Sequence, residues 1–179
     1  MLAECLGGKK LNRSEARALA SVQDDDLKNL LATAARLRDQ HKGRVVTFSP
    51  KVFVPLTNLC RDFCGYCTFR KAPDEPGAKT MTLEEVLRVV NQGKLLGCTE
   101  VLFSLGDKPE AIYPEMKSFL NERGHQRTLD YLHEACRVVL EETGLLPHSN
   151  PGVMGQGDLA RLKDVNPSMG LMLESVSER

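Results

Sequence analysis

The chain has 179 residues, of which 41% are hydrophobic and 27% are charged, a composition that supports one globular core. Its 24 Lys and Arg residues balance its 24 Asp and Glu residues, and this argues against nucleic acid as the main partner, because phosphate binding normally shows as a basic excess. No apolar run approaches the roughly 20 residues that span a membrane, and the first ten residues lack the ordered regions of a signal peptide. We therefore expect no membrane partner and a cytoplasmic protein with reduced thiols.

Residues 1–44 are predicted to form a helical extension after a loose leader at 1–10. Asn12 and Glu15 have the spacing of a capping box and predict a short helix over residues 13–21. A second helix is expected to begin at Asp24–Asp26, where negative charge favours a helix start, and to end at Gly43. Its leucines recur at helical spacing, and the two helices are expected to cover one end of the main domain, with a partner interface as the alternative.

Residues 45–179 alternate between strand and helix patterns, which indicates βα units and a mainly parallel sheet. Strands are predicted at Val45–Phe48, Lys51–Thr57, Glu100–Leu105, Leu145–Ser149 and Ser168–Glu174. Helices are predicted from the capping box at Thr82 to about Gly97, from Thr128 to Gly144, and in a short segment capped by Asp158.

Two features of this α/β pattern indicate an irregular or edge strand and an incomplete sheet. Pro55 lies inside a predicted strand, and proline is confined to edge strands or bulges because it lacks an N–H. The sequence stops after its fourth main strand, whereas complete parallel barrels have roughly 250 residues. We therefore expect residues 45–179 to be truncated at their C-terminal side, and the chain by itself to be marginally stable and inactive.

Three cysteines, Cys60, Cys64 and Cys67, follow the predicted strand at Lys51–Thr57 within a single loop. Thiols this close together hold a metal or form disulfides, and nothing marks the chain as secreted. Zinc prefers four ligands, commonly in two pairs, and no second pair is present. An iron–sulfur cluster usually takes four Cys, so three would leave one iron without a protein ligand, the open position that a catalytic metal needs.

The spacing Cys-x3-Cys-x2-Cys, with Tyr66 before the last Cys, resembles the signature of the radical S-adenosylmethionine (radical SAM) superfamily. Two longer stretches, Val54–Phe69 and Phe103–Glu110, are similar to the FO synthase family, and within it to the ring-closing 7,8-didemethyl-8-hydroxy-5-deazariboflavin synthases. The resemblance extends from about Leu11 to the last residue.

This resemblance implies a fold and two cofactors. The fold would be the N-terminal portion, about four βα units, of an open radical SAM (β/α)6 TIM-like barrel preceded by two helices. Cys60, Cys64 and Cys67 would hold a 4Fe–4S cluster whose open iron binds S-adenosylmethionine (SAM). A zinc-stabilised, non-catalytic module remains the alternative reading of the three cysteines.

Further residues are assigned to SAM by their places in the family's motifs. Tyr66 is expected near the adenine, although simple loop packing would also explain it. Ser104, Gly106 and Asp107 stand where the family receives the amino group of SAM, and a plain turn is the alternative. Glu174 and Ser175 are expected at the ribose hydroxyls, unless they only mark the end of the sheet.

The substrate residues are predicted with less support from the sequence. Arg70 and Lys71 follow the cysteine loop and would steer a carboxylate or an anionic substrate, or form a surface pair. His148 and Asn150 end a predicted strand and would face the cavity, although a single histidine is more often structural. The glycines at 152, 155 and 157 do not match a dinucleotide-binding fingerprint and predict a flexible loop.

The resemblance also implies a reaction and its partners. The small-molecule substrate would be the hydroxybenzyl adduct of a ribitylaminouracil, cyclised with loss of ammonia to FO, the precursor of a deazaflavin coenzyme. An electron donor for the cluster is needed, as is the tyrosine–uracil coupling half of FO synthase, as a separate protein or a fused domain. That coupling half itself, or a radical SAM enzyme of the thiazole or menaquinone type, remains an alternative.

Overall fold

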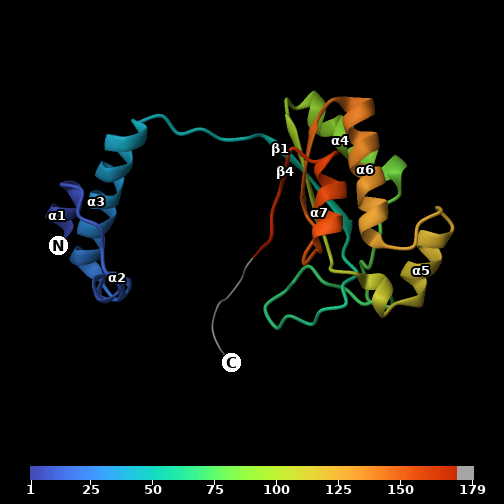
Figure 1. Cartoon of the computed structure of the whole chain (residues 1–179), viewed down its shortest axis with the longest axis horizontal. Coiled ribbons are helices and arrows are strands. Elements are labelled where there is room, and N and C mark those ends of the chain that lie inside the picture. Colours follow the sequence, from blue (N-terminus) through green and yellow to red (C-terminus); the bar gives the residue numbers. More distant parts are fainter. Residues whose placement is uncertain (173–179) are drawn as a thin grey trace. The chain divides into compact units, whose positions relative to one another are not determined.

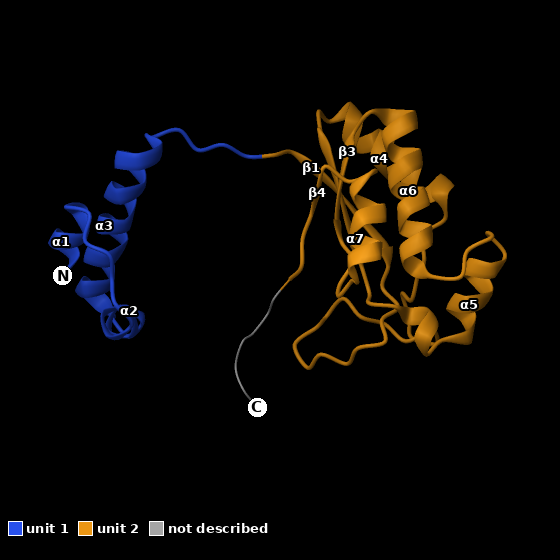
Figure 2. Ribbon diagram, in the orientation of Figure 1, with its two compact units in different colours: residues 1–48 blue, residues 49–179 orange. Residues whose placement is uncertain are grey.

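The structure, a computed structural model, describes residues 1–172 and divides into two compact units, Met1–Phe48 and Ser49–Arg179 (Figure 2). Because the two units are not placed relative to each other, each is described by itself.

The first unit contains helices α1 (Leu2–Leu6), α2 (Arg13–Ala20) and α3 (Asp24–Lys42). The predicted capping box is confirmed, because the Glu15 N–H donates to Asn12 Oδ1 over 2.9 Å and the Asn12 N–H donates to Glu15 Oε2 over 3.0 Å. Gly43 ends α3 with a φ of 69°, as expected for a glycine at a helix end.

One prediction for this unit is wrong. The residues expected to be a loose leader form α1, which packs against α3 and buries Cys5. Leu27 and Leu31 of α3 are 41% and 60% exposed, and the expectation that these helices cover one end of the main domain stays a prediction.

Residues 43–50 form no strand, so the strand predicted at Val45–Phe48 is also wrong. Val45 and Phe48 are 76% and 87% exposed. The β-branched pattern alone favours an extended backbone here, but a strand also needs a neighbour to accept its hydrogen bonds, and no described strand pairs with this segment.

The second unit is built on a four-stranded parallel sheet, which confirms the predicted α/β class (Figure 1). Its strands lie in the order β1-β2-β3-β4 and span Lys51–Thr57, Glu100–Leu105, Leu146–Asn150 and Ser168–Met169. β4 is shorter than the predicted strand, and residues 173–174 of that prediction lie outside the described residues.

Pro55 lies where its missing N–H can be tolerated. Within the described sheet β1 is an edge strand that pairs with β2 alone, and the register shifts between Pro55 and Thr57. Both positions that the sequence predicted for this proline, an edge strand and an irregularity, are therefore present together.

Helices and strands alternate along the unit. The helices of this unit are α4 (Leu83–Leu95), the short 3-10 helix η1 (Pro109–Ala111), α5 (Pro114–Asn121), α6 (Thr128–Thr143) and α7 (Gln156–Lys163). The sequence missed α5. Asp158 does not cap α7, whose N-cap is Gly155; its carboxylate instead accepts a hydrogen bond from Arg127 Nη1 over 2.7 Å.

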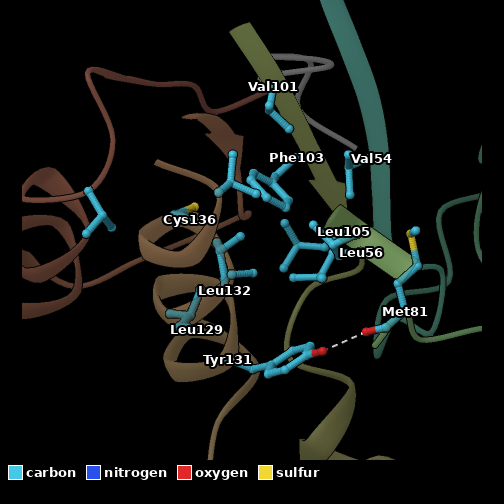
Figure 3. Packing of buried hydrophobic residues seen from close by; sticks show 14 of the residues in the cluster. Val54, Leu56, Met81, Val101, Phe103, Leu105, Leu129, Tyr131, Leu132 and Cys136 are labelled. Carbon is cyan, nitrogen blue, oxygen red and sulfur yellow. Dashed lines mark hydrogen bonds between the residues drawn. The ribbon is translucent and has the colours of Figure 1, made fainter. Parts of the chain in front are cut away.

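The core lies between the sheet and these helices, and alternate residues of β2 point into it (Figure 3). Val101 and Phe103 are fully buried, packed with Leu132 and Cys136 of α6 in one hydrophobic cluster. Burial raises the pKa of Tyr131 to about 12, so its hydroxyl stays protonated and donates to the Met81 carbonyl over 2.8 Å.

No helix within residues 1–172 combines the length and the apolar character needed to cross a bilayer.

The approach of α4 to β1 gives a test of the packing. A methyl group on Gly93 would lie 2.6 Å from Cβ of Val52, whereas one on Gly157 in α7 would meet nothing within 4 Å. We expect Gly93→Ala to lower the free energy of unfolding by about 1–3 kcal/mol because α4 must move away from the strand. Gly157→Ala is the matched control and should raise it by roughly 0.5–1 kcal/mol, the helix propensity gain.

Urea unfolding of the two variants measures both changes. Stabilisation by Gly93→Ala would show that α4 and β1 are not in the close contact described.

Candidate functional site

The carboxyl ends of β1, β2 and β3 lie at one edge of the sheet, and the loops that follow them surround a cavity of about 190 Å³. In Figure 1 the loop after β1 is the green loop at the bottom of the view. Nine of the predicted site residues line this cavity: Cys60, Cys64, Tyr66, Cys67, Arg70, Ser104, Gly106, Asp107 and Asn150.

The cysteine loop is closed at its base by Asn58. The Asn58 carbonyl accepts a hydrogen bond from the Lys71 N–H over 2.8 Å, and its side chain bonds to the Gly77 carbonyl and the Lys79 N–H over 2.8 and 2.7 Å. These contacts hold the two ends of the loop side by side.

The three thiols of the loop differ in exposure. Cys60 is partly buried and its Sγ accepts hydrogen bonds from the N–H groups of Asp62 and Asp107, over 3.4 and 3.2 Å. Burial raises the pKa of the Cys60 thiol, outweighing these hydrogen bonds, which lower it. Cys64 and Cys67 are exposed, and the Cys67 Sγ accepts from the Arg70 N–H over 3.4 Å.

Gly106 allows the turn after β2 to lie directly against the cysteine loop. A Cβ at this position would lie 2.0 Å from the Leu59 carbonyl oxygen and 2.6 Å from the Cβ of Cys60. The Gly106 N–H donates to the Thr57 carbonyl over 3.0 Å. A side chain at 106 is therefore excluded by backbone atoms that cannot move aside.

Asp107 is buried, and its two carboxylate oxygens have different surroundings. Oδ2 accepts a hydrogen bond from Arg61 Nε over 2.7 Å. Oδ1 has no hydrogen-bond donor within the described residues, and Lys108 Nζ lies 3.7 Å from it. A methyl group on Gly152 would lie 2.7 Å from Oδ1, so the loop after β3 closes over this oxygen.

Arg70 is held from several sides. Its Nη2 donates to the Tyr113 hydroxyl over 2.9 Å, and its guanidinium carbon lies 3.9 Å above the centre of the Phe63 ring. Its Nε is buried and has no acceptor within the described residues. Arg70 thus keeps one N–H donor available at a cavity that also contains the three thiols.

Two predicted residues do not line the cavity with the others, and two more lie outside the described residues. Lys71 is part of the loop base. His148 lies on β3, and its Nδ1 is 2.6 Å from Ser168 Oγ, so it does not contribute to the lining. The predictions for Glu174 and Ser175 fall outside the described residues.

Sequence reasoning missed Arg61, Tyr113 and Gly152 as parts of the site. Arg61 lies between two cysteines of the recognised motif, but its partner Asp107 is 46 positions away, and a contact of that separation leaves no local pattern. Gly152 was assigned to a flexible loop, whereas its backbone approaches Asp107 closely.

The residues present fit a cluster bound by three thiols. Cys60, Cys64 and Cys67 are free thiols on one cavity, and Asp107 Oδ1 and Arg70 Nε supply an unused acceptor and donor beside them. Within residues 1–172, no three His, Cys, Asp or Glu side chains are arranged to hold a single metal ion. A cluster does not require that arrangement, because each cysteine binds a different iron.

Comparison with known proteins identifies several relatives of this chain. An FO synthase of Nocardia farcinica is 51% identical over 181 residues, which cover 96% of this chain and 21% of that protein. An FO synthase of Mycobacterium tuberculosis is 46% identical over 186 residues, 96% of this chain and 22% of that protein. The 7,8-didemethyl-8-hydroxy-5-deazariboflavin synthase of Methanopyrus kandleri is 48% identical over 135 residues, 75% of this chain and 40% of that protein. The chain therefore spans about a fifth of the length of the FO synthases.

Solved structures show the same fold at low sequence identity. Methylornithine synthase (PylB) superposes with a TM-score of 0.69 at 21% identity, covering 92% of this chain and 44% of its own. The FeFe-hydrogenase maturase HydG from Carboxydothermus hydrogenoformans superposes with a TM-score of 0.71 at 21% identity, covering 94% of this chain and 37% of its own. The two superpositions show that the chain has part of the same α/β barrel-like fold, as the sequence predicted.

The Radical SAM superfamily matches residues 54–179, well over half of the sequence, from β1 through the cysteine loop and the cavity it lines. The chain belongs to the radical SAM superfamily, and within it is a homologue of FO synthase.

Proposed function

We propose that this chain carries the cluster-binding and SAM-binding part of a ring-closing FO synthase, a radical SAM lyase of deazaflavin biosynthesis. The observation that supports it most strongly is the meeting of Cys60, Cys64 and Cys67 with the Gly106–Asp107 turn around one cavity. The 48% identity to the Methanopyrus kandleri enzyme, whose name is that of the ring-closing activity, favours this half of the reaction. Because the chain covers only part of the length of its relatives, the activity of the whole protein is part of this proposal.

In this proposal Cys60, Cys64 and Cys67 would hold a 4Fe–4S cluster, and the cavity beside them would receive SAM. When bound and reduced, this pair of cofactors supplies a 5′-deoxyadenosyl radical from SAM, together with methionine. The protein binds and orients the cofactors and excludes water from the cavity. An external electron donor is required, since none of the described side chains is a redox centre that can reduce a cluster.

The polar groups of the cavity match the amino-acid end of SAM. Asp107 Oδ1 is a buried acceptor without a donor, which suits the ammonium group, and Ser104 lies on the same cavity. Arg70 Nε is a buried donor without an acceptor and suits the carboxylate. We assign Tyr66, 63% exposed on the cavity rim, to the adenine; Glu174 and Ser175 remain predictions for the ribose.

The substrate we propose is the hydroxybenzyl adduct of a ribitylaminouracil, which cyclises with loss of ammonia to give FO. Asn150, the last residue of β3, lines the cavity and is the described residue best placed to contact the substrate. His148 lies two residues earlier on the same face of β3, farther from the carboxyl edge, and we assign it a weaker contact with the substrate than Asn150. The tyrosine–uracil coupling half supplies this adduct and is the expected partner.

Removing any of the three loop thiols should abolish cluster binding. After anaerobic reconstitution we expect about four irons per chain, a brown colour and release of 5′-deoxyadenosine from SAM on reduction. Cys60→Ala, Cys64→Ala and Cys67→Ala should each lose most of the iron, while Cys98→Ser, outside the cavity, retains it. Iron analysis measures the iron content of each variant, and absorption spectra measure its colour. A colourless protein that takes up zinc instead would contradict the proposal.

Product analysis distinguishes the two halves of FO synthase. We expect FO fluorescence from the hydroxybenzyl adduct and none from tyrosine with the ribitylaminouracil, once this chain is fused to the remaining part of the Methanopyrus kandleri enzyme. Formation of the coupled adduct from tyrosine would assign the chain to the coupling half. The unfused chain tests the separate expectation that it is inactive by itself.

Arg70 should contribute to SAM affinity through its unused donor. We expect Arg70→Gln to weaken SAM binding to the reconstituted chain roughly tenfold, because a hydrogen bond to a charged group is lost. Arg88→Gln, an exposed arginine on α4, is the matched control and should leave affinity unchanged. Isothermal titration calorimetry measures the dissociation constants, and equal values for both variants would remove Arg70 from the SAM site.

A further inference from the structure

Arg61 and Asp107 are joined twice, by backbone and by side chain. The Arg61 N–H donates to the Asp107 carbonyl over 3.1 Å, and Arg61 Nε donates to Asp107 Oδ2 over 2.7 Å. The Asp107 side chain is 9% exposed and that of Arg61 38% exposed. This ion pair is therefore better shielded from solvent than the exposed surface pairs of the chain, and charge-assisted hydrogen bonds of this kind are among the strong ones.

The pair connects the cysteine loop to the turn after β2 beside the first of the three thiols. The N–H of Asp107 donates to Cys60 Sγ over 3.2 Å, so one residue contacts both Arg61 and Cys60. Gly106 lies against the Leu59 carbonyl group and the Cβ of Cys60 on the same side. By contrast, the Cys67 Sγ accepts a hydrogen bond from within its own loop, and Cys64 is exposed.

The pair also fixes the orientation of the Asp107 carboxylate. With Oδ2 held by Arg61, Oδ1 is left against Gly152, at the cavity and without a donor. Among residues 1–172, the positive charges near this carboxylate are Arg61 itself and Lys108, whose Nζ also donates to the Val153 carbonyl over 2.6 Å. In the same part of the chain the Arg61 guanidinium has one other acidic neighbour, Asp62, whose Oδ1 lies 3.9 Å from its Nε.

We propose that Arg61 is a positioning residue. Through Asp107 it holds Cys60 at the wall of the cavity before metal binds, and by holding Oδ2 of that carboxylate it leaves Oδ1 as the oxygen without a donor. That this arrangement prepares the loop for a cluster and for SAM rests on the proposed function. The arrangement itself is a property of the metal-free chain and is tested separately.

The first experiment measures thiol alkylation by iodoacetamide in the metal-free chain under anaerobic conditions, with each cysteine followed by mass spectrometry. We expect Arg61→Gln to increase the rate at Cys60 about tenfold, equivalent to about 1.4 kcal/mol of local stabilisation lost. The rates at the exposed Cys64 and at the core residue Cys136 should stay within about twofold of those in the unmodified chain.

Two variants separate this role from general destabilisation. Arg137→Gln removes an exposed arginine that pairs with Glu141 on α6, and it should change none of the rates. Arg61→Lys keeps the charge but not the fork geometry and should restore part of the protection. Asp107→Asn should expose Cys60 as Arg61→Gln does, and the double variant should add little to either, because both changes remove the same contact.

The second experiment measures iron uptake during reconstitution. We expect Arg61→Gln to load more slowly and to lose its iron faster to a chelator, with Arg61→Lys intermediate. If the unmodified chain takes up no iron, the proposed function fails while the alkylation result still decides the role of Arg61. An unchanged alkylation rate at Cys60 in Arg61→Gln would overturn the inference, as would an equal increase at Cys60 and Cys136.

Discussion

The site depends on one close approach, that of the turn after β2 to the start of the cysteine loop at Gly106. Any side chain there would overlap the Leu59 carbonyl, so only glycine allows the two segments to touch. The contact places Asp107 beside Cys60 and brings Arg61 within reach of the Asp107 carboxylate. It is possible because β1 and β2 are parallel neighbours, which deliver their following loops to the same edge of the sheet.

The register of the sheet explains which side chains reach the cavity. Pro55, Ser104 and Asn150 form one row across β1, β2 and β3, on the face opposite the helices. Ser104 and Asn150 of this row line the cavity. His148 pairs with Leu102 and lies two residues earlier on the same face, about 6–7 Å farther from the carboxyl edge. A shift of that size keeps a histidine on the correct face of a strand and still removes it from the site.

Local signals in the sequence were sufficient for capped helices, strands and the cysteine loop, because each is encoded within a few residues. Asn12 with Glu15, and Thr82 with Glu85, form the predicted capping boxes. Features that depend on distant partners were missed or misread. The strand expected at Val45–Phe48 has no neighbour to pair with, and Arg61 was overlooked because its partner comes from another loop.

The state of the three thiols follows from how the loop is held. Asn58 closes its base and Asp107 holds Cys60, while Cys64 and Cys67 are exposed. The part from Asp62 to Cys67 is held by the hydrogen bond from the Cys67 N–H to the Cys64 carbonyl, over 3.0 Å, and by the stacking of Arg70 on Phe63. Ordering a flexible residue costs about 1–2 kcal/mol of conformational entropy, so contacts that already hold the loop lower the entropy that a ligand must offset. The three thiols therefore share one cavity, with Cys60 held by the turn after β2 and with Cys64 and Cys67 exposed.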